Sequence, residues 1–154
     1  LVFTTVHANN VIDVLGRFLN MGVEPYQFVS ALNCVLAQRL VRRICLHCKR
    51  PAVVSREMLI ELALDPGLAT TQQFFEGAGC IECGGTGFKG RTAICELMDL
   101  TDRIRDMILE RRPTSEIKRA ARDEGMRFLR ECAVGLIMRG ESTLREINKV
   151  TFVE

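Results

Sequence analysis

Two pairs of cysteines constrain this chain more than any other feature of its sequence. Cys45 and Cys48 lie in CLHCKRP, and Cys80 and Cys83 lie in CIECGGTGFKGR. A CxxC turn points two thiolates at one place, so two such turns face to face supply the tetrahedral sulfur cage that zinc prefers. Four protein ligands leave no open position, which predicts a structural and not a catalytic zinc. Iron held by four thiolates is also chemically possible, because the spacing does not exclude it.

The segment 44–91 around these cysteines differs in character from the rest of the chain. Glycines and turn residues dominate it, and we expect only a short helix around 55–64 and a short strand around 73–76. Gly84, Gly85 and Gly87 allow tight turns that direct backbone N–H groups at the cysteine sulfurs. The sequence therefore predicts a small zinc-binding insertion that has no sizeable core of its own.

Cysteine content also bears on the compartment. Seven cysteines without a secretory signal pattern favour a reducing environment, so we expect a cytoplasmic protein. No apolar run approaches the roughly 18 residues of a membrane-spanning helix, so no transmembrane segment is expected. Cys34, Cys95 and Cys132 fall in apolar or helical patterns and are expected to be small buried residues. His47, inside the first turn, is expected to be exposed.

The first forty residues have the pattern of an α/β core. LVFTTVHANN begins as an apolar, β-branched run, which predicts a strand over 1–6 that is buried in a parallel sheet. It opens in mid-strand pattern without an initiator Met, so we expect the chain to be cut from a longer one. His7 would then lie at the carboxyl end of this strand, with Asn9 and Asn10 beside it, where open α/β sheets bind ligands.

Helices are predicted next. Asn9 or Asn10 can cap a helix that begins near Val11 and stops at Gly22, and Pro25 is well placed to begin another helix that runs to near Val41.

The last part of the chain returns to regular structure. RTAICELMDL alternates as a strand, and helices are predicted over 101–110, 115–123, 128–138 and 144–150, the last with a capping box of Thr143 and Glu146. We expect these helices to form a C-terminal bundle. The predicted domains are a portion of the core over 1–43, the zinc-binding subdomain over 44–91, and the strand with the helical subdomain over 92–154.

A phosphate-binding loop is missing from this sequence. No GxxxxGK[ST] motif occurs in the 154 residues, and GGTGFKGR has the wrong spacing and belongs to the predicted metal turn. We therefore expect that the chain by itself does not hydrolyse a nucleotide.

Three stretches carry a resemblance to a known family. They are TTVHANNVIDVLGRFLNMGVEPYQFVSALNCVLAQRLVRRICLHCK, GRTAICEL and DEGMRFL…GESTLREI. Together they resemble the C-terminal part of the bacterial ATPases of type II secretion and type IV pilus assembly, from the histidine box through the tetracysteine motif. The resemblance implies a RecA-like P-loop ATPase, cytoplasmic and peripheral to the inner membrane, that acts as a homo-hexamer on the platform protein of its machine. The residues that bind ATP and Mg²⁺ through the phosphate loop would precede Leu1.

Residue roles follow from the same resemblance. Matching the histidine box implies that His7 lies near the γ-phosphate, although the family often has Thr where Ala8 stands. Gln38 and Arg39 fall in the AQRL match, where packing and a place near the nucleotide are both open. The zinc-binding projection would contact the platform protein.

A second class of function is a zinc-ribbon-like adaptor. Its basis is a basic stretch without acids, composed of Arg39, Arg42, Arg43, Lys49 and Arg50, which could bind nucleic acid or acidic lipid. The net charge of only +2 and the lack of aromatic residues beside these arginines weigh against nucleic acid, which we do not expect as a partner. Binding with a steep salt dependence would distinguish the adaptor.

Overall fold

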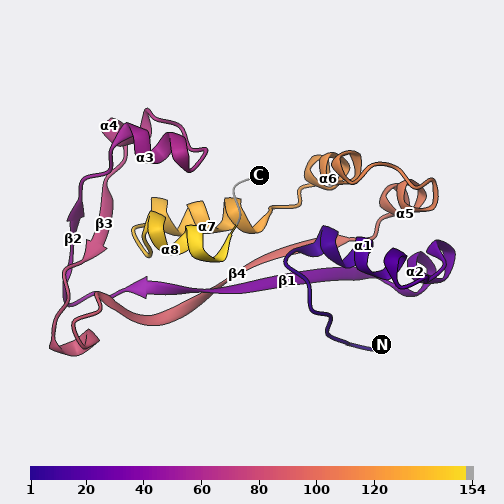
Figure 1. The fold of residues 1–154 in the computed structure, drawn as a ribbon, viewed down its shortest axis with the longest axis horizontal. Helices are drawn as coiled ribbons and strands as arrows, with labels where there is room; N and C mark the ends of the chain where they lie inside the picture. Colours follow the sequence, from indigo (N-terminus) through magenta and orange to yellow (C-terminus); the bar gives the residue numbers. More distant parts are fainter. Residues whose placement is uncertain (152–154) are drawn as a thin grey trace. The chain divides into compact units, whose positions relative to one another are not determined.

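The computed structural model describes residues 1–151 as an α/β structure of helices and two small sheets. Figure 1 labels the elements in chain order. Their bounds are α1 Val11–Asn20, α2 Pro25–Ala31, β1 Cys34–Ile44, β2 Lys49–Ala52, α3 Arg56–Glu61, α4 Leu68–Thr71, β3 Phe74–Gly77, β4 Phe88–Asp99, α5 Asp102–Leu109, α6 Thr114–Asp123, α7 Leu129–Met138 and α8 Leu144–Val150.

The chain divides into two compact units, each made of two stretches of sequence. The first joins Leu1–Gln38 to Cys95–Leu129, and the second joins Arg39–Ile94 to the described part of Arg130–Glu154. One sheet pairs β1 with β4, and the other pairs β2 antiparallel to β3 with Lys49 opposite Gly77 and Ala52 opposite Phe74. Among residues 1–151, no helix is long and apolar enough to cross a bilayer.

The first unit contains a continuous apolar core. Val11 and Ile104 are fully buried and Met98 is 1% exposed, so α1, α5 and the end of β4 share this core. Helix α1 begins where the sequence predicts, because the Asn10 side chain accepts a hydrogen bond from the Asp13 N–H at 2.8 Å. Burial of apolar surface therefore stabilises this unit.

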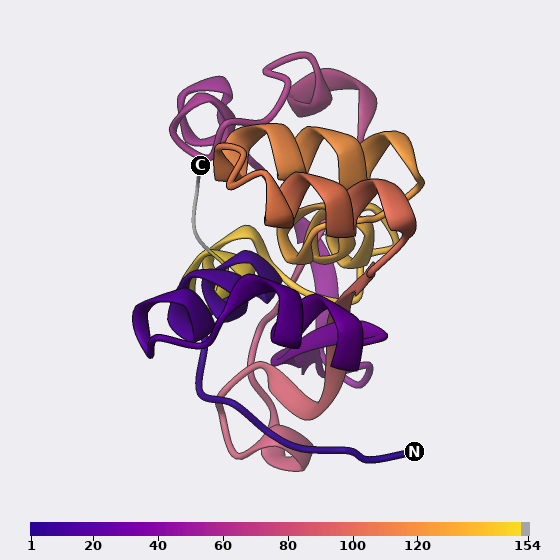
Figure 2. The ribbon, with the colours of Figure 1, turned by 90° about the vertical axis from the view of Figure 1, so that its right-hand side faces the viewer.

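The predicted strand over 1–6 does not form. Leu1, Val2 and Phe3 are 99%, 88% and 88% exposed, and the segment is drawn as an irregular trace that leads into α1 (Figures 1 and 2). A β-branched run becomes a strand only where neighbouring strands accept and donate its backbone hydrogen bonds. Within the described part of the chain, neither sheet includes this run.

The second predicted helix is too long. Helix α2 ends at Ala31, and strand β1 occupies Cys34–Ile44, where the sequence predicted helix as far as Val41. Along β1, Val35 and Val41 are buried whereas Leu36 and Leu40 are exposed, which is the two-residue period of a strand. Pairing with β4 overrides the apolar spacing that also matches a helix.

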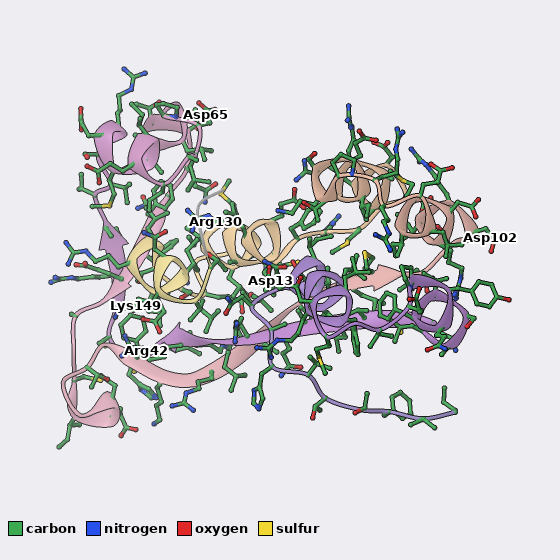
Figure 3. The ribbon with its side chains drawn as sticks, turned by 45° about the vertical axis from the view of Figure 1, so that its right-hand side comes forward. Asp13, Arg42, Asp65, Asp102, Arg130 and Lys149 are labelled. Carbon is green, nitrogen blue, oxygen red and sulfur yellow. The ribbon has the colours of Figure 1, made fainter. Side chains whose placement is uncertain are left out.

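In the second unit, the end of β1 is joined to the loop between α7 and α8. The Ile44 N–H donates to the Glu141 carbonyl at 2.9 Å, and the Ser142 hydroxyl donates to the Arg42 carbonyl at 2.9 Å. Arg130 donates to the Leu62 carbonyl at 2.8 Å, and so connects α7 to the turn after α3 (labelled in Figure 3). The predicted short helix and short strand are confirmed as α3 and β3.

The four predicted C-terminal helices form close to their expected bounds. Thr143 caps α8, because its hydroxyl accepts from the Glu146 N–H at 3.2 Å. However, α5 and α6 belong to the first unit whereas α7 and α8 belong to the second, so the prediction of one bundle is wrong. Residues of α5 and α6 share the apolar core of the first unit with Val35 and Met98, and α8 is joined to β1 by the Arg42–Glu146 ion pair. The division into functional domains at residues 43 and 91 stays a prediction.

Candidate metal centre and histidine segment

The four cysteines of the CxxC pairs come together in the second unit. Their sulfurs all lie within 4.8 Å of one another, and the Sγ–Sγ distances are 3.9 Å for Cys45–Cys80, 3.9 Å for Cys48–Cys83 and 3.7 Å for Cys80–Cys83. Four sulfurs about 2.3 Å from one tetrahedral zinc lie about 3.8 Å apart. These three distances therefore fit a tetrahedral metal.

Backbone N–H groups point at two of the sulfurs. Gly79 donates to Cys48 Sγ at 3.3 Å, and Cys80 and Gly87 donate to Cys83 Sγ at 3.2 Å each. These bonds stabilise negative charge on the thiolates, which is the usual support around a metal ligand. The prediction for Gly87 is thus confirmed.

Gly84 and Gly85 form the tight turn, as predicted, but do not themselves donate to a sulfur. Their N–H groups donate to the carbonyls of Ile81 at 3.2 Å and Cys80 at 2.9 Å, because both residues close the turn itself. With φ of 58° and 79°, they adopt the left-handed conformation that glycine tolerates best.

Two glycines allow a close backbone approach beside the cage. A Cβ atom on Gly77, at the end of β3, would lie 1.9 Å from the Gly87 carbonyl oxygen. A Cβ on Gly87 would in turn lie 2.4 Å from the Gly77 carbonyl oxygen. Larger residues at either position would separate β3 from the second cysteine turn, so these glycines help to position the cage.

The thiols of the cage differ in acidity. Desolvation acts to raise the pKa of Cys83, but the N–H donors of Cys80 and Gly87 lower it to about 6. Desolvation raises the pKa of Cys48 to about 11, against the N–H donor of Gly79. The Cys83 thiol therefore ionises more readily than the Cys48 thiol. A bound cation would favour the thiolate form of each ligand.

The other cysteines and His47 lie away from the cage. His47 is exposed, as predicted. Cys34 and Cys95 are exposed and Cys132 is half-buried, so the prediction that all three are buried is wrong. Cys34 and Cys95 lie on the outward side of β1 and β4, which the two-residue period of a strand turns away from the core.

His7 lies in the irregular segment before α1. Its side chain is exposed, and its backbone carbonyl accepts a hydrogen bond from the Arg17 guanidinium. Asn10 caps the start of α1, and Arg17 lies two turns further along the same helix. The segment from His7 to Asn10 is therefore attached to α1 at both ends.

Glu96 is a site residue that the sequence analysis did not identify. Its carboxylate is 2% exposed and accepts from the Val11 N–H at 2.7 Å and the Leu129 N–H at 2.9 Å. Each donor is the first residue of a helix, so one carboxylate accepts an N–H from the N-terminus of α1 and another from the N-terminus of α7. The sequence did contain a signal for this residue: a Glu lies between Ile94 and Met98 on one face of the predicted strand.

Gln38 and Arg39 lie in the middle of β1, not at the end of a helix. The Gln38 side chain is exposed and faces Cys95 of β4, with 4.0 Å between Oε1 and Sγ, whereas Arg39 is half-buried. Alternation along the strand points these neighbours to opposite faces of the ribbon.

Arg42 belongs to the predicted basic stretch but is paired. Its guanidinium donates to the two carboxylate oxygens of Glu146 at 2.7 and 2.6 Å, and Lys149 lies 3.6 Å from the same carboxylate (Figure 3). The Arg42 hydrogen bonds hold the pKa of Glu146 below its ordinary value. Arg42 therefore connects β1 to α8, and its charge is paired within the protein.

Comparison with known proteins identifies the protein family. Residues 1–149 match the family described as Type II/IV secretion system protein, so the chain belongs to this family. It is 42% identical over 147 residues to the type IV pilus assembly ATPase PilB of Thermus thermophilus, which covers 96% of this chain and 16% of that protein.

Of two further relatives, one is named for type IV pilus assembly and the other for type II secretion. The type IV pilus assembly ATPase PilB of Acinetobacter baylyi is 40% identical, over 98% of this chain and 26% of its own length. The type II secretion system protein HxcR of Pseudomonas aeruginosa is 38% identical, over 98% of this chain and 28% of its own length. The chain thus spans less than a third of the length of these relatives.

Proposed function

We propose that this chain is the C-terminal part of an ATPase that powers type II secretion or type IV pilus assembly. The observation that carries the proposal is the match of residues 1–149 to a family whose relatives are named as such ATPases. The chain contains no GxxxxGK[ST] loop, so ATP and Mg²⁺ would be bound mainly by the remainder of the longer protein. The chain alone is then inactive.

We also propose that Cys45, Cys48, Cys80 and Cys83 hold a structural zinc ion. The sulfur distances of 3.7 to 3.9 Å and the N–H donors to Cys48 and Cys83 support this assignment. All four ligand positions would be filled by protein, so the zinc would stabilise the fold and activate no water.

His7 is proposed as the residue that detects the γ-phosphate. Its exposed imidazole can donate an N–H to a phosphate oxygen, and it reports the phosphate through the segment that leads into α1. Glu96 positions that segment, because it holds the first N–H of α1 at 2.7 Å. Gln38 and Arg39 are proposed to lie near the nucleotide or to pack against a neighbouring subunit.

The longer protein is proposed to act as a cytoplasmic homo-hexamer at the inner membrane. Its partner would be the platform protein of the secretion or pilus machine, and the zinc-binding segment 44–91 would contact that partner. These proposals rest on the family to which the chain belongs.

The experiment is His7→Ala in the longer protein that carries this chain, with ATP turnover and zinc content measured together. Loss of a positioned donor to the transferred phosphate lowers turnover on the order of a hundredfold. His47→Ala is the matched control, since His47 is the only other histidine of the chain and is exposed. Turnover that is equal in wild type and His7→Ala, with zinc retained, would overturn the sensor role.

A further inference from the structure

The backbone that carries His7 is held by contacts although it forms no helix or strand. The His7 carbonyl accepts a hydrogen bond from the Arg17 guanidinium. Further along the segment, the Asn10 side chain caps α1, and the Val11 N–H donates to the Glu96 carboxylate at 2.7 Å. Of these contacts, only the one from Arg17 reaches His7 itself. The position of the imidazole therefore depends most directly on Arg17.

The geometry of α1 places Arg17 for this contact. Helical side chains lean toward the N-terminus of their helix, so the long Arg17 side chain extends toward the segment that precedes α1. Asp13, four residues earlier, has the spacing of an ion-pair partner, but within the described residues the guanidinium donates to the His7 carbonyl instead. Arg17 is exposed, so packing in a core does not account for this orientation.

The helix dipole is the ordinary explanation for a basic residue at this place. Arg17 belongs to the last turn of α1, where a positive charge stabilises a helix. The dipole acts on charge alone, however, and requires no donor at a particular carbonyl. A hydrogen bond to the residue proposed to detect the phosphate is therefore a second feature of Arg17, which kinetics can separate from the first.

We propose that Arg17 is a positioning residue for His7. Its hydrogen bond fixes the His7 carbonyl, and with it the peptide from which the imidazole extends toward the γ-phosphate. A donor that is held in place before the reaction stabilises the transition state without reorganisation during the reaction. The inference rests on the proposed role of His7, and it adds a residue that acts through His7 and not on the nucleotide.

The test measures kcat and KM for ATP in the longer protein that carries this chain. Arg17→Met keeps the aliphatic length of the side chain but removes every N–H donor. We expect kcat to fall roughly tenfold to a hundredfold, because displacement of a reacting group costs about this much. KM should change less, since Arg17 does not itself bind the nucleotide.

Two further single variants control for charge and folding. Arg17→Lys restores an N–H donor on a side chain of similar length and should recover part of the lost kcat. Arg119→Met removes an exposed arginine from α6 of the same unit and should leave kcat at the wild-type value. Urea unfolding and zinc content of Arg17→Met should match the wild type, because the Arg17 side chain is exposed.

A double variant separates positioning from a structural role. If Arg17 acts only through His7, His7→Ala combined with Arg17→Met should be as slow as His7→Ala alone, because no imidazole is left to position. A residue that supports the fold or the nucleotide by another route would instead add its full loss to that of His7→Ala.

The outcomes distinguish this inference from the proposed function on which it rests. It is supported by a slow Arg17→Met, partial recovery in Arg17→Lys and a double variant equal to His7→Ala. Wild-type kcat in Arg17→Met, equal kcat in Arg17→Lys and Arg17→Met, or a double variant slower than His7→Ala by the full Arg17 factor would overturn it. Undiminished turnover in His7→Ala alone would overturn the sensor role itself.

Discussion

The core of the first unit and the two cysteine turns are held in shape by different physical means. In the first unit, buried apolar side chains from α1, α2, β4, α5 and α6 pack together, with Val11 and Ile104 at no exposure. In the turns over 45–48 and 80–87, the described residues include only Cys45 and Gly87 as buried ones. Burial stabilises the first region, whereas the second has few buried residues around its four sulfurs.

This contrast shows how a short loop-rich segment can project from a domain. Apolar burial needs many contacts from distant parts of the chain, and the turns have few such residues. The metal proposed for these four thiolates would replace that core with a few strong bonds. The turns are then free to carry aliphatic and basic residues on their surface, as Leu46 and Lys89 do.

The largest expected effect is the loss of a cage ligand. Cys48→Ser should abolish zinc binding and the order of the cysteine turns, because three thiolates hold a structural metal poorly. Hydrogen exchange of peptides from 45–52 and 77–91 should accelerate strongly, while peptides from α1 remain protected. Cys34→Ser, at an exposed cysteine outside the cage, is the control and should change neither region.

The second prediction concerns a substitution in the apolar core of the first unit. Ile104→Ala should lower the free energy of unfolding by about 2 to 5 kcal/mol, because it leaves a cavity at a fully buried site. Urea unfolding measures the change, and zinc content should stay at the wild-type value. Leu109→Ala, on the same helix but 40% exposed, should cost much less. Equal costs at the two positions would contradict the description of this core.

Glu96 tests whether a polar group organises the apolar unit. Glu96→Gln keeps the size of the side chain but directs an NH₂ group at one of two N–H donors, and should cost about 2 to 3 kcal/mol. Asp99→Asn, at an exposed position of the same strand, serves as control. If Glu96→Gln unfolds at the wild-type urea concentration, the carboxylate does not hold the two helix N-termini.

The smallest effect concerns Glu146, whose pKa is held low by Arg42. A lowered pKa contributes stability above the ordinary carboxyl value of about 4.5, and this contribution is lost as the pH falls through the lower, folded value. Glu146→Gln should therefore cost about 1 to 2 kcal/mol near neutral pH. The difference from wild type should shrink below pH 4.5, measured by urea unfolding of both proteins at each pH. A constant difference would contradict the ion pair.

Local signals in the sequence were sufficient for several features. Asn10 identified the start of α1, because a capping side chain acts on its own turn. The alternation in RTAICELMDL predicted the strand β4, but not its inward face, because Cys95 on the outward face was expected to be buried. Two CxxC pairs were enough to predict which four sulfurs would meet.

Features that depend on distant partners could not be predicted. Residues 34–41 fit a helical stripe, and only their pairing with β4 makes them a strand. Residues 1–6 have the composition of a strand but find no partner within the described chain. Glu96 and Arg42 acquire their roles from residues 33 to 104 positions away, which no local pattern encodes.

The most direct test of the central claim is elemental analysis of the chain purified without added metal, followed by chelation with hydrogen exchange as the readout. We expect one zinc per chain, and loss of protection in the cysteine turns alone when the metal is removed. A chain that contains no metal, with the turns protected to the same degree before and after chelation, would contradict the account.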